Sequence, residues 1–418
     1  MPDSQREFDL VLYGATGFVG RLTAQYLARA GGQARIALAG RNGERLRAVR
    51  DELGASARSW AILHADASAP TTLTEMAERA QVVVSTVGPY TRYGLPLVAA
   101  CAEAGTDYAD LTGEAMFVRN SIDGYHKQAV DTGARIVHAC GFDSIPSDLS
   151  VYALHRQVVA DDTGQMLDTD FVLRRFRGGL SGGTIASGME MMRTASSDPE
   201  ARRAVADPYT FSADRAAEPR LGAQPDFPWR RGAEIAPELA GIWTGGFLMA
   251  PYNTRVVRRS NELLGWAYGR RFRYSEQMSV GSSILASATA ALVTVGNKAA
   301  VELGSRYFRL LPRRWVERLA PQPGTGPSET QRDRGFYQAQ TFTITSTGAR
   351  YRAGIAQQGD PGYKATAVLL GESGLALALD RDRLSPLTGV LTPAAAMGDA
   401  LLDRFPAAEV VLEVTRLG

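Results

Sequence analysis

The sequence predicts an α/β protein in which a Rossmann-type, doubly wound parallel sheet is followed by a second, α+β domain built on a mostly antiparallel sheet. Apolar strands and amphipathic helices alternate from residue 8 to about residue 140, a pattern typical of a parallel sheet covered on both faces. A glycine-rich turn, GATGFVG, joins the first strand to the first helix, as in dinucleotide-binding proteins. The segment from about 155 to 360 differs, because it contains a long strand at 166–176 and a hairpin at 336–358.

The elements of the first domain can be assigned in chain order. Strands are expected at 8–13, 34–40, 60–66, 82–88, 107–110 and 134–140, and helices at 17–30, 43–53, 71–79, 94–104 and 120–132. The three consecutive valines at 82–84 suit a strand that is buried on both faces. This order of elements is that of a doubly wound sheet.

The first turn is a candidate dinucleotide site. Its three glycines lie between a predicted strand and a predicted helix, where a missing Cβ lets backbone amides approach a diphosphate at the positive end of the helix. The residues predicted to bind the cofactor here are Gly14, Ala15, Thr16, Gly17, Phe18, Val19 and Gly20. The alternative is a turn that needs glycine only for its own geometry.

The ends of the second and third strands indicate which dinucleotide is bound. An NAD enzyme usually has Asp or Glu after the second strand, and that carboxylate would repel a 2′-phosphate. Arg41 stands there instead and can pair bidentately with a phosphate, so we expect NADP(H); a solvated surface arginine is the alternative. Asp66, after the third strand, either caps the next helix or contacts the adenine edge of the cofactor.

The end of the fourth strand is expected beside the nicotinamide ribose, because ligands of such sheets bind at the carboxyl ends of the strands. Thr86, Val87, Gly88 and Pro89 close this strand and are predicted to bind the cofactor. Tyr90 follows them and is a candidate catalytic residue within reach of the reacting ring. An ordinary buried aromatic side chain is the alternative.

Two further segments supply candidate substrate residues. Asp143 and Ser144 stand just past the sixth strand, where Asp143 is a candidate proton donor and Ser144 a candidate substrate contact; helix capping is the alternative. A second glycine-rich turn opens a helix within 177–197. The backbone amides of Ser181, Gly182 and Gly183 are candidates to hold a substrate carbonyl oxygen, unless this turn is a flexible loop without a ligand.

Several familiar catalytic motifs are missing. The sequence contains no YxxxK, HExxH or P-loop motif, which argues against a short-chain dehydrogenase, an HExxH zinc protease or a kinase. The two cysteines form neither a CxxC motif nor a disulfide framework, so we expect no metal site and a reducing, cytoplasmic location. A formal net charge of +2 over 418 residues argues against a nucleic-acid partner.

Residues 277–297 carry no charge. Their serines, threonines and glycines argue against a membrane-spanning helix, so we expect a buried helix or an apolar surface that touches lipid or an acyl chain. Arginines flank this stretch at 255, 258, 259, 270, 271 and 273, and again at 309, 313, 314 and 318. They are either solvated faces or a basic platform that suits an acidic carrier protein or an anionic membrane.

Six segments together resemble the saccharopine dehydrogenase-like oxidoreductases. They are the turn at 14–20, the Gly40-Arg41 pair, residues 87–90, YADLTGE at 108–114, GFDSIPSD at 141–148 and GVLTPAAAMGDALL at 389–402. Within this family the chain is most similar to the mycobacterial trans-acting enoyl reductases, which serve polyketide synthases that make phthiocerol and phenolphthiocerol lipids.

The resemblance implies a function and a domain order. The implied reaction is the NADPH-dependent reduction of a carbon-carbon double bond in a polyketide or fatty acyl chain held as a thioester on a synthase carrier domain. The implied domains are an NADP-binding domain at 1–150, an inserted substrate domain at 151–360, and C-terminal helices at 361–418 that return to the first domain. The alternatives are an amino- or imino-acid oxidoreductase, as the wider family name suggests, and a non-catalytic NADP-binding protein at a lipid surface.

Overall fold

The computed structural model describes residues 6–179, 181–308 and 326–417, and within them it shows two seven-stranded sheets. The first sheet has the order β13-β6-β5-β4-β1-β2-β3, and all of its pairs are parallel. Its strands are β1 (Phe8–Tyr13), β2 (Ile36–Gly40), β3 (Ala61–His64), β4 (Ala80–Ser85), β5 (Asp107–Asp110), β6 (Arg135–Val137) and β13 (Gly389–Leu391). The predicted doubly wound sheet is therefore confirmed.

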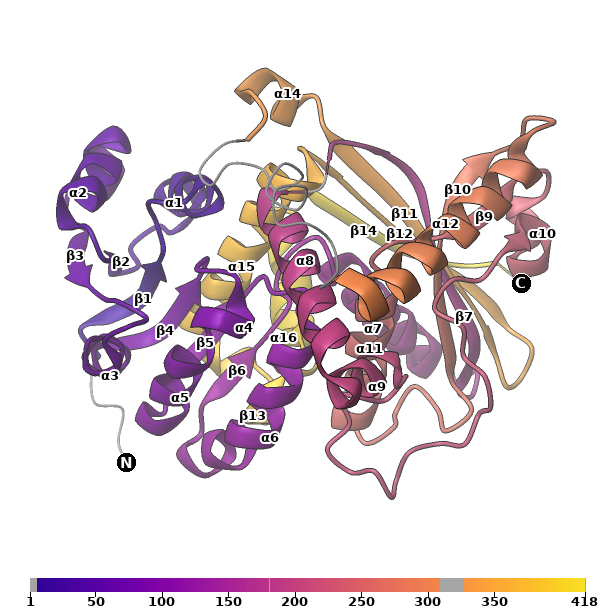
Figure 1. The fold of residues 1–418 in the computed structure, drawn as a ribbon, viewed down its shortest axis with the longest axis horizontal. Coiled ribbons are helices and arrows are strands. Elements are labelled where there is room, and N and C mark those ends of the chain that lie inside the picture. Colours follow the sequence, from indigo (N-terminus) through magenta and orange to yellow (C-terminus); the bar gives the residue numbers. More distant parts are fainter. Residues whose placement is uncertain (1–5, 180, 309–325, 418) are drawn as a thin grey trace.

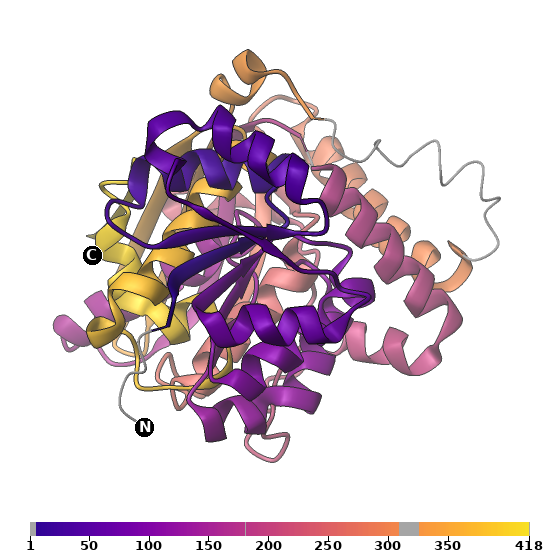
Figure 2. The ribbon, with the colours of Figure 1, turned by 90° about the vertical axis from the view of Figure 1, so that its left-hand side faces the viewer.

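Helices cover both faces of this sheet (Figure 2). They are α1 (Phe18–Ala30), α2 (Gly43–Glu52), α3 (Pro70–Arg79), α4 (Tyr90–Tyr93), α5 (Leu95–Ala104), α6 (Ala115–Thr132), α7 (Ile145–Ala160), α15 (Thr366–Leu379) and α16 (Pro393–Arg404). Successive strand residues point to opposite faces, so Leu10 and Leu12 of β1 join one buried cluster and Val11 joins the other. Residues 366–378 of α15 are buried throughout, because this helix packs between α1, β4 and α16.

The second sheet is mostly antiparallel, as predicted, with one parallel pair between β7 and β10. Its order is β14-β12-β11-β7-β10-β9-β8. The strands are β7 (Met166–Arg177), β8 (Arg230–Arg231), β9 (Trp243–Gly246), β10 (Arg273–Gly281), β11 (Phe336–Thr345), β12 (Arg350–Gln358) and β14 (Val410–Arg416). The helices of this region are α8 (Gly182–Ser197), α9 (Pro199–Ala206), α10 (Gly232–Ile235), α11 (Ala250–Leu263), α12 (Ala286–Tyr307) and α14 (Glu329–Asp333).

The C-terminal segment contributes to both sheets (Figure 1). Strand β13 pairs with β6 of the first sheet, whereas β14 pairs with β12 of the second. Helices α7 and α11 pack against each other between the two sheets. The division into domains at 1–150, 151–360 and 361–418 stays a prediction.

The uncharged stretch at 277–297 does not form the single buried helix that was one expectation. Its first residues belong to β10, which ends at Gly281, residues 282–285 form a turn, and residues 286–297 belong to α12. One side of α12 packs against α8 and β9, while Leu292 and Val295 are 73% and 64% exposed. In the described ranges, we find no helix with the length and apolar character to cross a bilayer.

The six of these arginines that the structure describes do not form one basic platform. Arg255, Arg258 and Arg259 of α11 are buried, whereas those at 270, 271 and 273 are exposed. The arginines at 309, 313, 314 and 318 lie outside the described residues. The first three are buried because α11 packs between α7 and β10, and their guanidinium groups contact other residues of the protein.

Candidate active site

The glycine-rich turn after β1 is so tight that Gly14 and Gly20 have no room for a side chain. Gly14 has φ +92°, and a Cβ there would lie 2.7 Å from Thr86 Oγ1, while a Cβ on Gly20 would lie 2.2 Å from the Gly14 carbonyl oxygen. Thr86 donates its hydroxyl to the Tyr13 and Gly14 carbonyls at 3.2 Å. The turn at 14–20 and the end of β4 are thus locked together.

The first turn of α1 fits a dinucleotide diphosphate. Its N-cap is Gly17, with no side chain capping the helix and no acidic residue in the first turn. The positive end of a 13-residue helix therefore carries amide donors that no side chain of the turn occupies, as an anion requires. Phe18 packs edge-on against Tyr363, with ring centroids 5.0 Å apart, and this contact joins the turn to the segment after β12.

Arg41 and Asp66 lie at the ends of β2 and β3, on the same edge of the sheet. Arg41 is exposed and close enough to Asp66 for its positive charge to contribute to lowering the pKa of that carboxyl, after the larger effect of the hydrogen bonds from Ser68. Asp66 accepts from the Ser68 amide and hydroxyl and does not cap α3, whose N-cap is Ala69. The edge therefore presents an exposed guanidinium where the 2′-phosphate of NADP(H) is expected.

Glu114 holds the loop that follows β4. It is 1% exposed, and its carboxylate accepts from the amides of Tyr90 and Thr91 at 2.8 and 2.7 Å and from the Thr91 hydroxyl at 2.5 Å. It also accepts from the hydroxyl of Ser187, on α8, at 2.6 Å. One carboxylate thus ties the end of β4, beside the expected nicotinamide, to a helix of the second region. We gave this residue no role from the sequence.

The side chain of Tyr90 does not support a catalytic role. Tyr90 is 3% exposed, its ring stacks on Phe117 at 5.5 Å, and its hydroxyl donates to the Ser85 carbonyl at 3.0 Å. The hydroxyl is therefore directed into the core, because α4 begins at Tyr90 and turns the ring back toward α6. The main chain of Tyr90 remains at the site, held by Glu114.

Asp110 ties the loops after β5 and β6 together. Its buried carboxylate accepts from the Tyr108 hydroxyl, lies 2.8 Å from His138 Nδ1, and accepts from the amides of Thr112 and Ala139 at 3.0 and 3.2 Å. Ala139 has φ +66°, a left-handed conformation that non-glycine residues rarely adopt. These hydrogen bonds hold that conformation and so fix the start of the loop that carries Asp143.

The carboxyl group of Asp143 has no hydrogen-bond partner among the described residues, and burial is the sole cause of its pKa shift. Burial raises the pKa of its side chain to about 6. A Cβ on Gly113 would stand 4.0 Å from Asp143 Oδ2 and 3.6 Å from Met249 Cε. Asp143 therefore faces the end of β5 and the start of α11, and it keeps its proton to a higher pH than an ordinary aspartate. This placement agrees with a proton donor.

Ser144 has a structural role in this geometry, which does not support its predicted contact with substrate. It is fully buried, and its hydroxyl donates to Asn253 Oδ1 at 3.0 Å. Asn253 in turn donates to Glu276 at 2.9 Å. These hydrogen bonds seat the first turn of α11 on the loop after β6.

The second glycine-rich turn lies beside the first, but one of its amides is already used. Gly182 donates its amide to the Tyr363 hydroxyl at 3.0 Å, and Ser181 is buried, so neither presents the open donor that was predicted. Gly183 is exposed in the first turn of α8. Because Tyr363 also packs on Phe18, the turn at 181–183 and the cofactor turn share one neighbour.

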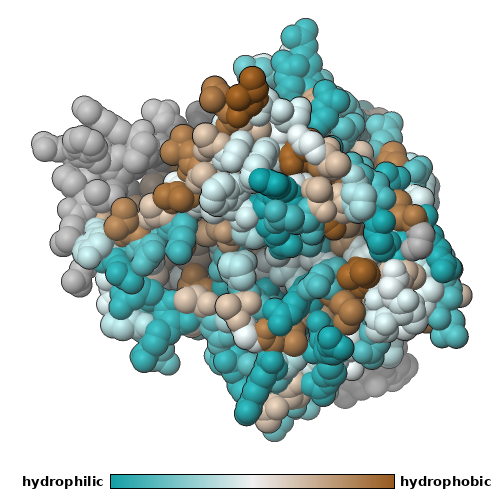
Figure 3. Space-filling view, turned by 90° about the vertical axis from the view of Figure 1, so that its right-hand side faces the viewer, coloured by the Kyte–Doolittle hydropathy of each residue, from teal (hydrophilic) through white to brown (hydrophobic). Residues whose placement is uncertain are grey.

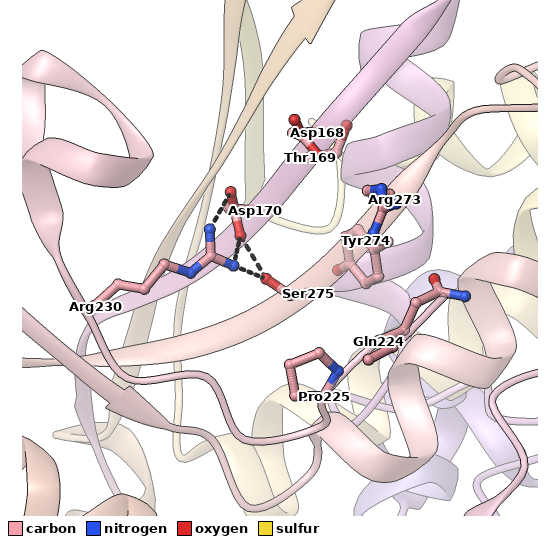
Figure 4. Close-up of a pocket in the computed structure, with 10 residues that line it drawn as sticks. Asp168, Thr169, Asp170, Gln224, Pro225, Arg230, Arg273, Tyr274 and Ser275 are labelled. Carbon is pink, nitrogen blue, oxygen red and sulfur yellow. Dashed lines mark hydrogen bonds and ion pairs between the residues drawn. The ribbon is translucent and has the colours of Figure 1, made fainter. Parts of the chain in front are cut away.

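One hollow among the described residues lies away from these turns. A cavity of about 190 Å³ lies at the starts of β7 and β10 and is shown in Figure 4, where Arg230 reaches Asp170 and Ser275. Arg230 and Asp170 neutralise each other there. The hollow is formed by β7, β10, Arg230 and the 223–225 loop, and none of the predicted cofactor residues lines it.

The fold and this site define the class of the protein: it is an NADP-dependent oxidoreductase of the doubly wound type. Residues 10–137 match the family model described as the saccharopine dehydrogenase NADP binding domain. The chain is 66% identical over 418 residues, covering 100% of both chains, to a trans-acting enoyl reductase of Mycobacterium tuberculosis. The identity to that of Mycobacterium ulcerans is 64% over the same length and coverage. A further Mycobacterium tuberculosis protein, provisionally named as a trans-acting enoyl reductase, is 69% identical over 417 residues and 100% of each chain.

The chain therefore belongs to the trans-acting enoyl reductase family of saccharopine dehydrogenase-like oxidoreductases. Among solved structures, the saccharopine dehydrogenase (L-Glu forming) of Saccharomyces cerevisiae is similar, with a TM-score of 0.55, 14% identity, and 98% and 99% of the two chains covered. This likeness shows a common fold. The predicted family, fold class and NADP cofactor are confirmed, whereas the individual site residues stay predictions.

Proposed function

We propose that the protein is an NADPH-dependent trans-acting enoyl reductase that reduces a carbon-carbon double bond in a thioester-bound polyketide or fatty acyl intermediate of complex lipid biosynthesis. The observation that carries this proposal is the 64–69% identity, from end to end, to proteins that bear this name. The site supports it, because burial raises the pKa of the Asp143 carboxyl to about 6, which suits a residue that gives up a proton in the reaction.

The chain's own residues fit the cofactor. The amides at the start of α1 would hold the diphosphate, Arg41 would hold the 2′-phosphate, and the main chain at 86–90 would lie along the nicotinamide. When bound, NADPH supplies a hydride to the β-carbon of the unsaturated thioester. Glu114 keeps the loop at 86–90 in one position, so that the reduced ring and the acyl chain are presented in a fixed orientation.

Asp143 is the group that we assign to protonate the α-carbon. Reduction leaves negative charge on the thioester and requires one proton. With a pKa of about 6, the Asp143 carboxyl is protonated in a larger fraction of molecules near neutral pH than an ordinary aspartate is. No side chain competes for that proton among the described residues, so it is available to a substrate.

The internal contacts made by the buried arginines of α11 argue against an amino-acid substrate. Such a substrate needs cations that converge on its carboxylates. Arg255 pairs with Asp226, Arg259 pairs with Glu262 at 2.6 Å, and Arg258 donates to the Tyr274 carbonyl at 3.0 Å. These three arginines of α11 are buried; their terminal nitrogens make these contacts, whereas their Nε atoms have no hydrogen-bond partner among the described residues.

The partner that presents the acyl chain is proposed to be a carrier domain of a polyketide synthase, as the word trans-acting in the relatives' names suggests. We also propose that the exposed side of α12 contacts lipid. The apolar residues of this side, each more than half exposed, are Leu292, Val295, Leu303 and Tyr307 of α12 and Ile284 and Leu285 just before it. Figure 3 shows apolar side chains on this side of the molecule in separate areas, not as one continuous patch. A cytoplasmic location stays a prediction.

Two experiments test the proposal. Purified protein should oxidise NADPH on addition of the N-acetylcysteamine thioester of crotonic acid, and should not do so with an imino acid. Asp143→Asn should lower kcat by about a hundredfold, as expected for the loss of a positioned acid, while Asp131→Asn, an exposed position on α6, should leave kcat unchanged. Turnover of the imino acid alone would replace this function with the amino-acid alternative, and no turnover of either would favour a non-catalytic role.

The lipid contact is tested separately. The protein should sediment with vesicles that contain anionic phospholipid, and Leu292→Ser should reduce the bound fraction without changing the rate with the soluble thioester. Equal sedimentation of both proteins would exclude the α12 face as the contact.

A further inference from the structure

Tyr252 has a buried hydroxyl group without a partner. The side chain is 5% exposed, and its hydroxyl oxygen has no hydrogen-bond partner among the described residues. A buried tyrosine hydroxyl usually finds a partner. Such a group at the edge of an active site is therefore a candidate to bind something that the free protein lacks.

Tyr252 lies in the first turn of α11, above the ends of β5 and β6. Its two neighbours in this turn fix that position: Met249 faces Gly113 at the end of β5, and Asn253 accepts from Ser144, the residue after Asp143. The ring of Tyr252 packs edge-on against Phe211 at 5.8 Å and lines a narrow cavity with His138 and Ala139. Tyr252 thus stands beside the loop that carries the proposed acid.

The surroundings of the Tyr252 hydroxyl keep it protonated. Burial is the main cause that raises the pKa of Tyr252, and the nearby carboxyl groups of Asp110, Asp143 and Glu114 and the thiol of Cys140 raise it further. The Asp110 and Glu114 carboxylates already accept four hydrogen bonds each. The hydroxyl is accordingly a hydrogen-bond donor, not a base, at neutral pH.

We propose that Tyr252 is a further catalytic residue of the reductase, whose hydroxyl donates a hydrogen bond to the carbonyl oxygen of the bound thioester. This inference rests on the proposed function. As the hydride bonds to the β-carbon, the double-bond electron pair moves toward the carbonyl and leaves an enolate with negative charge on that oxygen. The electron pair then returns to the α-carbon, which takes the proton from Asp143, and Asp143 regains a proton from solvent. A donor preplaced at the oxygen stabilises the enolate and the transition state before it.

The proposal gives Asp143 and Tyr252 separate tasks in the reaction. The charge of Asp143 contributes to raising the pKa of Tyr252, so the two groups lie in one region of the site, and in this proposal they serve different atoms, the α-carbon and the carbonyl oxygen. Of the amides that the sequence suggested as donors, that of Gly182 is used in the structure by a bond to Tyr363 and so does not serve the carbonyl oxygen. Tyr252 supplies a donor from a helix instead of a loop, and α11 is fixed by its hydrogen bonds to Ser144 and Glu276.

Tyr252→Phe is the direct test, with Tyr268→Phe as its matched control. Tyr268 is also a buried tyrosine whose hydroxyl has no partner among the described residues, but it packs against His155 and Phe272, away from the loop at 141–144. Both substitutions remove one oxygen and no hydrogen bond. We expect Tyr252→Phe to lower kcat with the crotonyl thioester by about a hundredfold, to change the Kd for NADPH less than threefold, and to leave the melting temperature unchanged. Tyr268→Phe should keep the kcat of the unaltered protein.

A spectroscopic measurement tests the same contact without turnover. The saturated butyryl thioester, labelled with ¹³C at its carbonyl, is bound to the protein with NADP⁺, and its carbonyl resonance is recorded. A hydrogen bond from Tyr252 should move this resonance downfield of the free thioester, and Tyr252→Phe should return it most of the way, while Tyr268→Phe should not. The thioester bound to the unaltered protein can be measured without any variant. If its carbonyl resonance is not displaced from that of the free thioester, the proposal is overturned.

The two levels of the account can fail separately. If the unaltered protein does not reduce the crotonyl thioester, the proposed function fails. If it does, and Tyr252→Phe keeps kcat within threefold and an unchanged carbonyl resonance, then Tyr252 only packs and this inference is wrong.

Discussion

The carboxylate of Glu114 allows a demanding test, because glutamine has the same shape and differs from it by an NH₂ group in place of one oxygen. Each oxygen of Glu114 accepts from one backbone amide and one hydroxyl: Oε1 from Tyr90 and Ser187, and Oε2 from both donors of Thr91. Glu114→Gln keeps the size of the side chain but exchanges one oxygen for an NH₂ group. A hydroxyl can rotate and accept from that group, whereas a backbone amide cannot.

In either orientation of the glutamine, one buried backbone amide loses its acceptor and faces another donor. Losing a hydrogen bond to a charged acceptor and leaving the amide unsatisfied costs about 2–4 kcal/mol. We expect the free energy of unfolding to fall by that amount. The loop at 86–90 should also move more freely, which should raise the Kd for NADPH about tenfold.

Guanidinium chloride unfolding gives the first quantity, and a fluorescence titration with NADPH gives the second. Glu103→Gln is the control, because Glu103 is exposed on α5 and the same change there should alter neither. A Glu114→Gln protein within 0.5 kcal/mol of its parent, with the parent's Kd for NADPH, would show that this carboxylate does not hold the loop.

Three further outcomes are expected. Gly20→Ala should abolish NADPH binding, measured by titration, since its Cβ would lie 2.2 Å from the Gly14 carbonyl oxygen in a turn that cannot widen; retained affinity would refute the tight-turn argument. Arg41→Ala should reduce the ratio of NADH to NADPH dissociation constants at least tenfold, and an unchanged ratio would remove the 2′-phosphate from Arg41. The pKa values of Asp143, Asp148 and Glu276 are raised by burial to about 6, 7 and 7, so the folded state binds more protons than the unfolded chain between pH 4 and 7, and the free energy of unfolding should fall as the pH rises through that window. Asp143→Asn should flatten this fall, and a free energy that rises from pH 5 to 7 would contradict the raised values.

The sequence carried enough information for the parallel sheet because its signal is local. Each buried strand is a short apolar run, and each turn is marked by glycine or proline, so the strand β4 and the turn at 14–20 could be placed without knowing what packs on them. The hairpin of β11 and β12 was marked in the same way by Ser346, Thr347 and Gly348.

The orientation of individual side chains could not be predicted. Tyr90 has the right place in the chain for catalysis, but whether its ring faces the crevice or the core depends on α6, which begins 25 residues later. Ser144 and Gly182 were likewise predicted to contact substrate from their positions in the sequence. Each instead donates a hydrogen bond to a residue far along the chain, Ser144 to Asn253 and Gly182 to Tyr363. Contacts of such separation leave no trace in a local pattern.

The charge pattern of the sequence did not predict the burial of the arginines in α11 either, because that burial also depends on contacts with distant parts of the chain. The arginines at 255, 258 and 259 have the spacing of a helix face, and their sequence is that of a solvated surface. They are buried because α11 packs between α7 and β10, where Asp226, Glu262 and the Tyr274 carbonyl meet them. Tyr252 and Glu114 were missed because neither lies in a recognisable catalytic motif.

Isotope transfer tests the central claim most directly. The protein is incubated with the crotonyl thioester and NADPH that carries deuterium at its transferable position, and the saturated product is examined by mass spectrometry and NMR. We expect one deuterium at the β-carbon and a solvent-derived proton at the α-carbon. Deuterium at any other position, or a saturated product without it, would contradict hydride reduction of an enoyl thioester by this site.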